Sequence, residues 1–308
     1  SDVLVHNFRK GVMEDLGFGY ERLKEVNPRL IYATSSGWGD AGPYADRGRA
    51  GHDMMARAEG GWFVFYDDRK PPIPGGVSID YPAGLNLMLG IMMALYHRER
   101  SGKGQIVSTD LLSVAFHAHA WDAAARLNAQ KIDRPAALGG TEAAIQKAFA
   151  TEDGFIEISP VFSDNALRDI SVAMGLGDLS TDPRFETESL QIQHKCELNE
   201  ILANRFREKK TDSWMRELEE SGVLCAKIND FDAVAQDPQI EANRMVIEME
   251  GAEGESLKLL GNPVRMHGTP AKMKQFPPNL GEHSETIVRE LGYSDKKIQN
   301  LKDSGVIQ

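Results

Sequence analysis

The apolar positions between residues 85 and 95 form the longest hydrophobic stretch of the chain and predict its central helix. They recur on nearly every face of a helix, a pattern typical of a helix buried inside a protein. Pro82 suits the first helical turn, where its missing N–H would be unpaired anyway. Two arginines in the last turn and Gly102 after them are the usual signals of a helix end. We therefore predict a buried helix that begins near Asp80 and ends near Gly102.

Two short apolar runs near the start of the chain, at 3–8 and 30–34, predict strands. Each run stops at polar residues, as buried parallel strands do when they deliver their carboxyl ends to a site. A helical pattern at 20–26 lies between them, and this succession predicts a parallel sheet. A further strand is predicted at 105–110, followed by a helix at 111–128. Ligands of such sheets bind beyond the carboxyl ends of the strands.

The pattern changes after about residue 130. Residues 130–142 are polar and carry Pro and Gly without periodicity, which indicates a linker. Residues 149–158 alternate around an Asp-Gly pair and predict a β-hairpin. Helices are then predicted at 165–174, 189–209 and 212–221, a strand at 246–249, and a last pair of helices at 284–291 and from 294. We predict an α/β fold with an open parallel Rossmann-like sheet in a large domain, and a small α+β domain. The large domain would comprise 1–129 and 244–308, and the small domain with its linker 130–243.

Composition places the chain among ordinary soluble globular proteins and argues against several partners. The 46 acidic and 35 basic residues give a net charge of −11, which argues against nucleic acid and anionic membrane surfaces. The start of the sequence, residues 1–5, has no basic residues and no cleavage pattern, so we expect no signal peptide, and the apolar helix falls short of a membrane span of about 20 residues. Two cysteines are too few for a disulfide framework and indicate a reducing, cytoplasmic setting. No zinc spacing occurs, so we predict no metal site.

Asp80 is the first candidate for chemistry. The positive end of the helix dipole favours its charged form, and the Gly75-Gly76 loop offers N–H groups for an oxyanion. An ionised carboxylate in that place suits a nucleophile. Aspartate before a helix is also a common N-cap, and the residues alone leave both interpretations open.

His52 is the second candidate, because it lies in a polar loop between Gly51 and Asp53. Three other histidines lie on predicted helices, where a core or surface role is the more common one. The chain has no nucleophile-elbow serine motif and no Walker A loop, which removes two familiar enzyme classes.

Many short segments resemble the family III CoA-transferases of the CaiB/BaiF type, such as formyl-CoA transferase and carnitine CoA-transferase. The same superfamily contains the α-methylacyl-CoA racemases. The matching segments are 2–9, 27–32, 37–39, 42–43, 51–53, 76–84, 102–105, 182–185, 222–225, 237–239, 280–283 and 291–293. They follow in order across the whole chain. The resemblance implies that the chain lacks a further strand–helix segment with which family members begin.

The resemblance implies a CoA-transferase in which Asp80 attacks an acyl-CoA thioester and forms an acyl-aspartyl anhydride. Coenzyme A then passes to a free carboxylic acid, so acyl-CoA and the acid are substrates and no cofactor is bound permanently. The catalytic positions implied are Asp80 and His52. The positions implied to bind CoA are Asn7, Phe8, Arg9, Gly51, His52 and Asp53. A ring-like chain in an interlocked cytoplasmic homodimer is also implied.

Two alternatives stay open at this point. In a 2-methylacyl-CoA racemase, His52 and Asp80 would exchange the α-proton as an acid/base pair. The other alternative is an inactive CoA-binding subunit that depends on a partner polypeptide.

Overall fold

The computed structural model describes residues 1–64, 71–128, 144–159, 163–251 and 254–308. The chain divides into two compact units, 1–143 and 144–308. The predicted linker at 130–142 lies outside the described residues. The domain boundaries expected from the sequence, including the assignment of 244–308 to the large domain, stay predictions.

The first unit is a mixed α/β unit built on a parallel sheet, as the sequence predicts. Its elements are β1 (Val3–His6), α1 (Val12–Asp15), α2 (Tyr20–Val26), β2 (Ile31–Ser36), α3 (Asp53–Glu59), β3 (Phe63–Val64), β4 (Ile73–Pro74), α4 (Asp80–Ser101), β5 (Ile106–Asp110), α5 (Leu111–Ala118) and α6 (Ala120–Asn128). The single helix predicted over 111–128 is two helices, because α5 ends at His119, whose backbone leaves the helical conformation.

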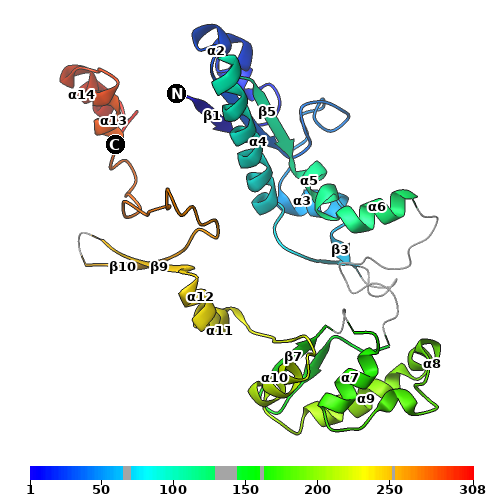
Figure 1. Cartoon of the computed structure of the whole chain (residues 1–308). Coiled ribbons are helices and arrows are strands. Elements are labelled where there is room, and N and C mark those ends of the chain that lie inside the picture. The colour runs from blue at the N-terminus through cyan, green and yellow to red at the C-terminus, as the bar shows by residue number, and fades with distance from the viewer. Residues whose placement is uncertain (65–70, 129–143, 160–162, 252–253) are drawn as a thin grey trace. The chain divides into compact units, whose positions relative to one another are not determined.

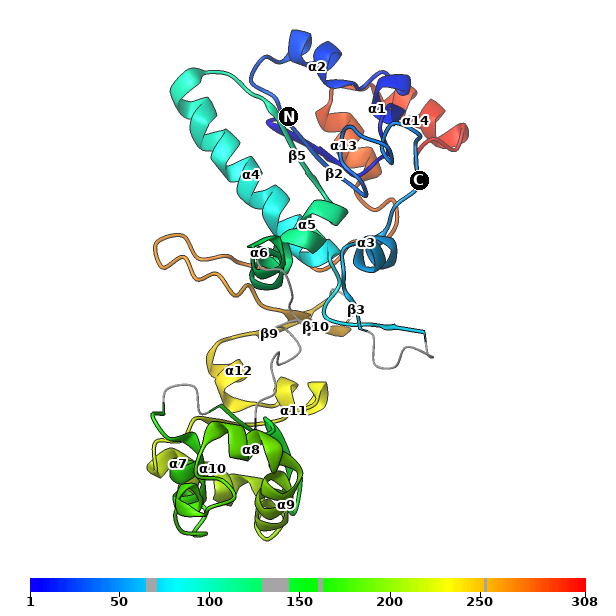
Figure 2. The same cartoon turned by 90° about the vertical axis from the view of Figure 1, so that its right-hand side faces the viewer.

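The parallel sheet has the strand order β1-β2-β5. Val3 pairs with Ile31, and Tyr32 pairs with Ile106, so all three carboxyl ends lie at one edge. The middle strand β2 is the most buried, and Ile31 and Ala33 have no exposed surface. Because β2 and β5 pack against α4, the helix runs beside the sheet in both views (Figures 1 and 2). The sheet edge with the carboxyl ends is therefore the place to look for a ligand.

Helix α4 is buried along one face only, so the prediction of a helix buried on all sides is wrong. Its buried positions are Ala83, Leu87, Ala94 and Arg98, which recur at helical spacing toward the sheet. Its exposed large apolar and aromatic side chains are Tyr81, Leu85, Met88, Leu89, Met92, Met93 and Tyr96, which are 43–67% exposed. No described element of the first unit covers that face, which is why an apolar pattern on every side did not translate into burial. The predicted helix end is confirmed by Gly102, which adopts φ of 72°.

The start of α4 packs into a small core with α3 and α5. Its members are Ala56, Ile79, Ala83, Leu111, Val114 and Ala115, with Trp62 packed against them. Ile79 is 1% exposed and immediately precedes Asp80. The residue that carries the candidate carboxylate is thus attached to a fixed point of the core.

The second unit is α+β and contains its own core around Trp214, Phe149 and Phe206. Its elements are β6 (Ala148–Ala150), β7 (Phe155–Ile158), α7 (Ala166–Ala173), the 3-10 helix η2 (Leu179–Thr181), α8 (Glu188–Gln193), α9 (Lys195–Phe206), α10 (Thr211–Glu220), β8 (Cys225–Lys227), α11 (Phe231–Ala235), α12 (Pro238–Ala242), β9 (Val246–Glu250), β10 (Ser256–Leu260), α13 (Ser284–Glu290) and α14 (Asp295–Asp303). The predicted hairpin is confirmed as β6 and β7, and β8 completes an antiparallel sheet. Across the described ranges, no helix combines the length and apolar character that crossing a membrane requires.

Candidate active site

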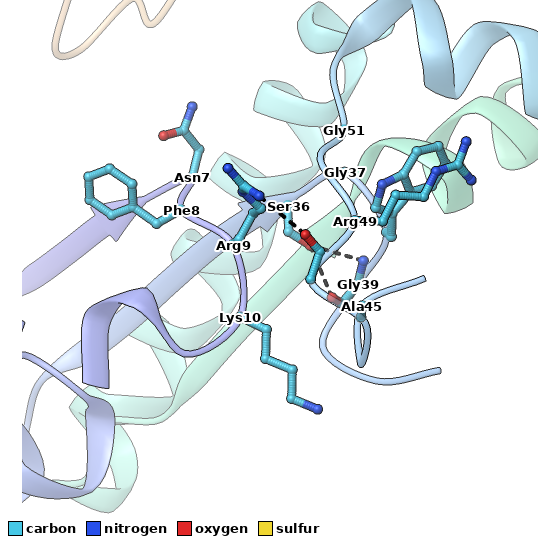
Figure 3. Close-up of a pocket in the computed structure, with 12 residues that line it drawn as sticks. Asn7, Phe8, Arg9, Lys10, Ser36, Gly37, Gly39, Ala45, Arg49 and Gly51 are labelled. Atoms are coloured by element: carbon cyan, nitrogen blue, oxygen red, sulfur yellow. Dashed lines mark hydrogen bonds between the residues drawn. The ribbon is translucent and has the colours of Figure 1, made fainter. Parts of the chain in front are cut away.

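A pocket lies at the carboxyl ends of β1 and β2, where the parallel sheet predicts a ligand site (Figure 3). Residues after each strand end line it, together with the loop that leads to α3. The lining residues are Asn7, Phe8, Arg9, Lys10, Ser36, Gly37, Trp38, Gly39, Ala45, Gly48, Arg49 and Gly51. Residues 7–10 and two parts of the segment 36–51 therefore meet around one opening.

Two glycines allow these stretches to meet. A Cβ atom on Gly37 would lie 2.8 Å from the Cα atom of Gly51. A Cβ atom on Gly51 would lie 2.8 Å from Nε1 of Trp38, whose indole N–H donates to the Ala50 carbonyl. Any other residue at either position would push the two loops apart.

Cationic side chains gather around the pocket although the whole chain is acidic. Arg9 donates to the Gly48 carbonyl over 3.2 Å, and Figure 3 shows its guanidinium extending toward that loop. Lys10 pairs with Asp46 over 2.7 Å, and this hydrogen bond holds the pKa of the Asp46 carboxyl below its usual value. Such a local excess of positive charge suits an anionic ligand.

Arg49 is held in place by aromatic rings and a carboxylate. Its guanidinium lies 4.3 Å from the ring centre of Trp38 and 4.5 Å from that of Tyr44. It also forms an ion pair with Glu59 of α3, and that hydrogen bond lowers the pKa of the Glu59 carboxyl. A guanidinium fixed between rings is preorganised for contacts with a planar or anionic group.

Four of the residues expected to bind CoA line the pocket, namely Asn7, Phe8, Arg9 and Gly51. Lys10, Trp38 and Arg49 also line the pocket but were not predicted from the sequence. Two of them had a signal in the sequence, because Lys10 lies in the polar stretch after the first strand and Arg49 shortly precedes the Gly51-His52-Asp53 segment. His52 and Asp53 are not among the lining residues and have other partners.

His52 is the N-cap of α3. Its Nδ1 atom accepts a hydrogen bond from the Met54 N–H over 3.2 Å, which satisfies one of the free amides at the helix start. The ring itself is exposed.

Asp53 and Arg57 connect α3 with the loop before α4. Oδ1 of Asp53 accepts hydrogen bonds from the Ile79 N–H and from the Ser78 hydroxyl, the latter over 3.0 Å. Arg57 donates to the Gly75 carbonyl over 2.6 Å and pairs with Asp53 over 3.4 Å. Burial raises the pKa of Asp53, but these hydrogen bonds outweigh it and lower the pKa below its usual value.

Asp80 is the first residue of α4, and its side chain is exposed. The N-cap position belongs to Ile79, and no side chain caps this helix start. Within the described residues, the Asp80 carboxylate has neither a hydrogen bond nor an ion pair. The Gly75 N–H, expected to be free for an oxyanion, donates to the Trp62 carbonyl over 2.8 Å. In the part of the chain that the structure describes, no group of His, Cys, Asp or Glu is arranged to hold a metal ion.

The sequence of the chain matches a known class of enzyme. Residues 1–284 match the CoA-transferase family III, and the chain belongs to this family. The family predicted from the ordered sequence segments is thereby confirmed, and the chain is a CoA-transferase by class.

Two relatives and one solved structure show which members of the family the chain resembles. The chain is 36% identical to an acyl-CoA transferase of Fusarium pseudograminearum, over 100% of this chain and 68% of the relative. It is 30% identical to the succinyl-CoA:glutarate CoA-transferase of Homo sapiens, over 99% of this chain and 70% of the relative. The structure of a CaiB/BaiF family protein from Brucella suis superposes with a TM-score of 0.78 at 30% identity. That match covers 94% of this chain and 76% of the other.

Proposed function

We propose that this chain transfers coenzyme A from an acyl-CoA to a free carboxylic acid through an acyl-aspartyl anhydride on Asp80. The observation that carries the proposal is the state of the Asp80 carboxylate: exposed, without a partner among the described residues, and attached to a buried Ile79. A carboxylate without hydrogen bonds keeps its lone pairs available for attack. The helix dipole of α4 favours its ionised form.

In the proposed reaction, an Asp80 carboxylate oxygen attacks the thioester carbonyl carbon, and the C–S bond breaks to release the CoA thiolate. The acceptor carboxylate attacks the Asp80 carboxyl carbon of the anhydride and displaces the donor acid. The thiolate then attacks the acceptor acyl carbon, which forms the new thioester and restores the Asp80 carboxylate. Positioning must supply much of the rate, and well-oriented groups contribute about 7–11 kcal/mol.

We infer that the pocket at the sheet edge holds the phosphates of CoA. Arg9, Lys10 and Arg49 supply positive charge there, and Gly37 and Gly51 allow the backbone to come close. Asp53 lies two residues beyond Gly51 and holds the amide next to Asp80. One short segment thus connects the pocket with the backbone that carries Asp80.

We propose a small dicarboxylic acid as the acid substrate. The relatives of the chain include the succinyl-CoA:glutarate CoA-transferase of Homo sapiens and the acetyl-CoA:oxalate CoA-transferase of Acetobacter aceti, both of which handle dicarboxylates by name. Succinyl-CoA with glutarate is therefore the first pair to assay, and acetyl-CoA with oxalate the second. Mass spectrometry of the products would identify the acyl group that gained CoA.

The test of the mechanism is to trap the intermediate. Incubation with succinyl-CoA and hydroxylamine should convert Asp80 into a hydroxamate, which peptide mass spectrometry locates. Asp80→Asn serves as the control and should carry no adduct. Turnover of the wild-type chain with an unmodified Asp80 would refute the proposal. Deuterium exchange into the α-position of a 2-methylacyl-CoA would instead support the racemase, and activity only after a second polypeptide is added would support the inactive subunit.

We also infer a homodimer acting in the cytoplasm. The apolar side chains exposed on α4 support an arrangement in which another polypeptide covers that face. Sedimentation equilibrium of the purified chain would measure the assembly directly.

A further inference from the structure

We infer that Asp53 and Arg57 of α3 are positioning residues that hold the Gly75-Gly76 loop and the first turn of α4, and thereby aim Asp80. The inference rests on the proposed role of Asp80 as nucleophile. Asp53 was expected to contact CoA, and we assign it instead to the backbone that carries the carboxylate.

The carboxylate of Asp53 acts directly on the residue before Asp80. It accepts from the backbone N–H of Ile79 and from the hydroxyl of Ser78, both in the segment that leads into α4. The Asp80 side chain has no described partner of its own. Its place therefore depends on its backbone, and Asp53 is the side chain that binds this backbone.

Arg57 lies one helical turn after Asp53 and holds the other end of the loop. Its Nη2 atom donates to the Gly75 carbonyl over 2.6 Å and to the Gly76 carbonyl over 3.3 Å. Its Nη1 atom pairs with Asp53 over 3.4 Å. The guanidinium of Arg57 thus joins the Gly75-Gly76 loop to the Asp53 carboxylate, which binds the Ile79 amide. These contacts connect α3 with the loop before α4 and the start of α4.

The surroundings make the connection stiff. The side chains of Arg57 and Asp53 are only 11% and 18% exposed, so solvent screens their interaction weakly. Gly76 adopts φ of 69°, and a Cβ atom there would lie 2.1 Å from the Trp62 ring, so the loop lies directly on the indole. Ala56 and Ile79 close the same core.

A shift of the nucleophile by 1 Å can cost about 10²-fold in rate, even when the altered residue is remote from the chemistry. A loosened loop leaves the phosphate contacts in the pocket intact, because neither Asp53 nor Arg57 lines it. Loss of the pair should therefore lower the rate of acylation and leave CoA binding almost unchanged.

The experiment compares Asp53→Asn, Arg57→Gln and the double variant with the wild-type chain. Single-turnover acylation by succinyl-CoA is followed through the hydroxylamine adduct on Asp80, and the Kd of CoA is measured by calorimetry. Each single variant should acylate at least about 10-fold more slowly, with the Kd within about threefold. The double variant should be little slower than either single one, because residues that act as a unit are not additive. Arg57→Lys should recover part of the rate, since lysine keeps the charge and can donate hydrogen bonds but lacks the planar fork of the guanidinium.

Glu285 and Arg289 provide the matched control. They form another acid–arginine pair at i,i+4, on helix α13. Glu285→Gln and Arg289→Gln should leave acylation and CoA binding at the wild-type values.

Hydrogen exchange separates this inference from the proposed function. The peptide that contains Ile79 should exchange faster in Asp53→Asn and in Arg57→Gln, whatever the chemistry at Asp80. Wild-type acylation rates and unchanged exchange in both variants would overturn the inference. If the two variants lost acylation rate and CoA affinity to the same extent, the inference would also be overturned, because that result would assign Asp53 and Arg57 a role in CoA binding or in folding. A wild-type chain without an adduct on Asp80 would refute the proposed function, and the exchange result would still decide whether the connection exists.

Discussion

Replacing Gly51 by alanine is the most direct test of the pocket. The added Cβ atom would lie 2.8 Å from Nε1 of Trp38 and 2.9 Å from the Cα atom of Gly37. Non-bonded heavy atoms are comfortable at about 3.5–4.0 Å, so the two loops must separate by about 1 Å. Overpacking of this kind costs about 1–3 kcal/mol.

The separation should weaken CoA binding as well as folding. Figure 3 shows Asn7, Phe8 and Arg9 on one side of the opening and Gly51 and Arg49 on the other, so phosphate contacts made from both sides cannot all be kept. We expect the Kd of CoA to rise about 10-fold, which corresponds to 1.4 kcal/mol. The melting temperature should fall by about 2–8 °C for each kcal/mol of lost stability.

Calorimetry with CoA and thermal denaturation followed by circular dichroism measure the two effects. Gly84→Ala is the control, because a Cβ atom there meets no atom within 4 Å and alanine is the better helix former. It should bind CoA as the wild-type chain does and melt at the same or a higher temperature. A wild-type Kd in Gly51→Ala would refute the placement of CoA against these loops.

Three further predictions concern the nucleophile, the second core and acid stability. Asp80→Asn should lower kcat at least about 10³-fold in a succinyl-CoA:glutarate assay, with an unchanged Kd for CoA by calorimetry. Trp214→Ala removes a side chain with no exposed surface, whose indole N–H donates to the Phe206 carbonyl; urea denaturation should show a loss of about 3–5 kcal/mol, and wild-type stability would contradict the assigned core. The pKa of Asp53 is lowered in the folded chain, so its stabilisation is complete above the unfolded pKa of about 3.9 and is lost as the pH falls through the folded value. The difference in melting temperature between wild type and Asp53→Asn should therefore be constant near pH 6–7 and shrink below pH 4; a difference that grows toward acid would show the opposite shift.

Local signals predicted the elements of the first unit well. Helix α2 begins and ends as expected at Tyr20 and Val26, and α4 ends before a left-handed Gly102, because caps and turns act within a few residues. Strand pairings between residues far apart in the sequence were harder to predict. Strand β8 has three residues and gains its stability from β7, about 70 residues earlier, so no periodicity marks it.

The site residues that directly follow a strand could be predicted from the sequence. Those whose role depends on tertiary packing could not. The resemblance to the CoA-transferases implied that Asn7, Phe8 and Arg9 bind CoA. The strand predicted at 3–8 ends at His6, so these three residues come directly after β1 and line the pocket at the sheet edge. Arg57 matched no motif, because its role arises from contact with a loop 18 residues away. The prediction that α4 is buried on all sides was wrong for the same reason. Hydrophobicity alone does not show which face of a helix packs against another element.

The open face of α4 makes part of this chain sensitive to oxidation. Met88, Met92 and Met93 are 54–62% exposed, so peroxide can reach each thioether sulfur and convert it to a sulfoxide. Sulfoxides are polar, so storage in air would gradually convert this apolar surface into a polar one. Any molecule that shields the face slows that conversion, and the mass gain of each methionine would record how completely it is shielded.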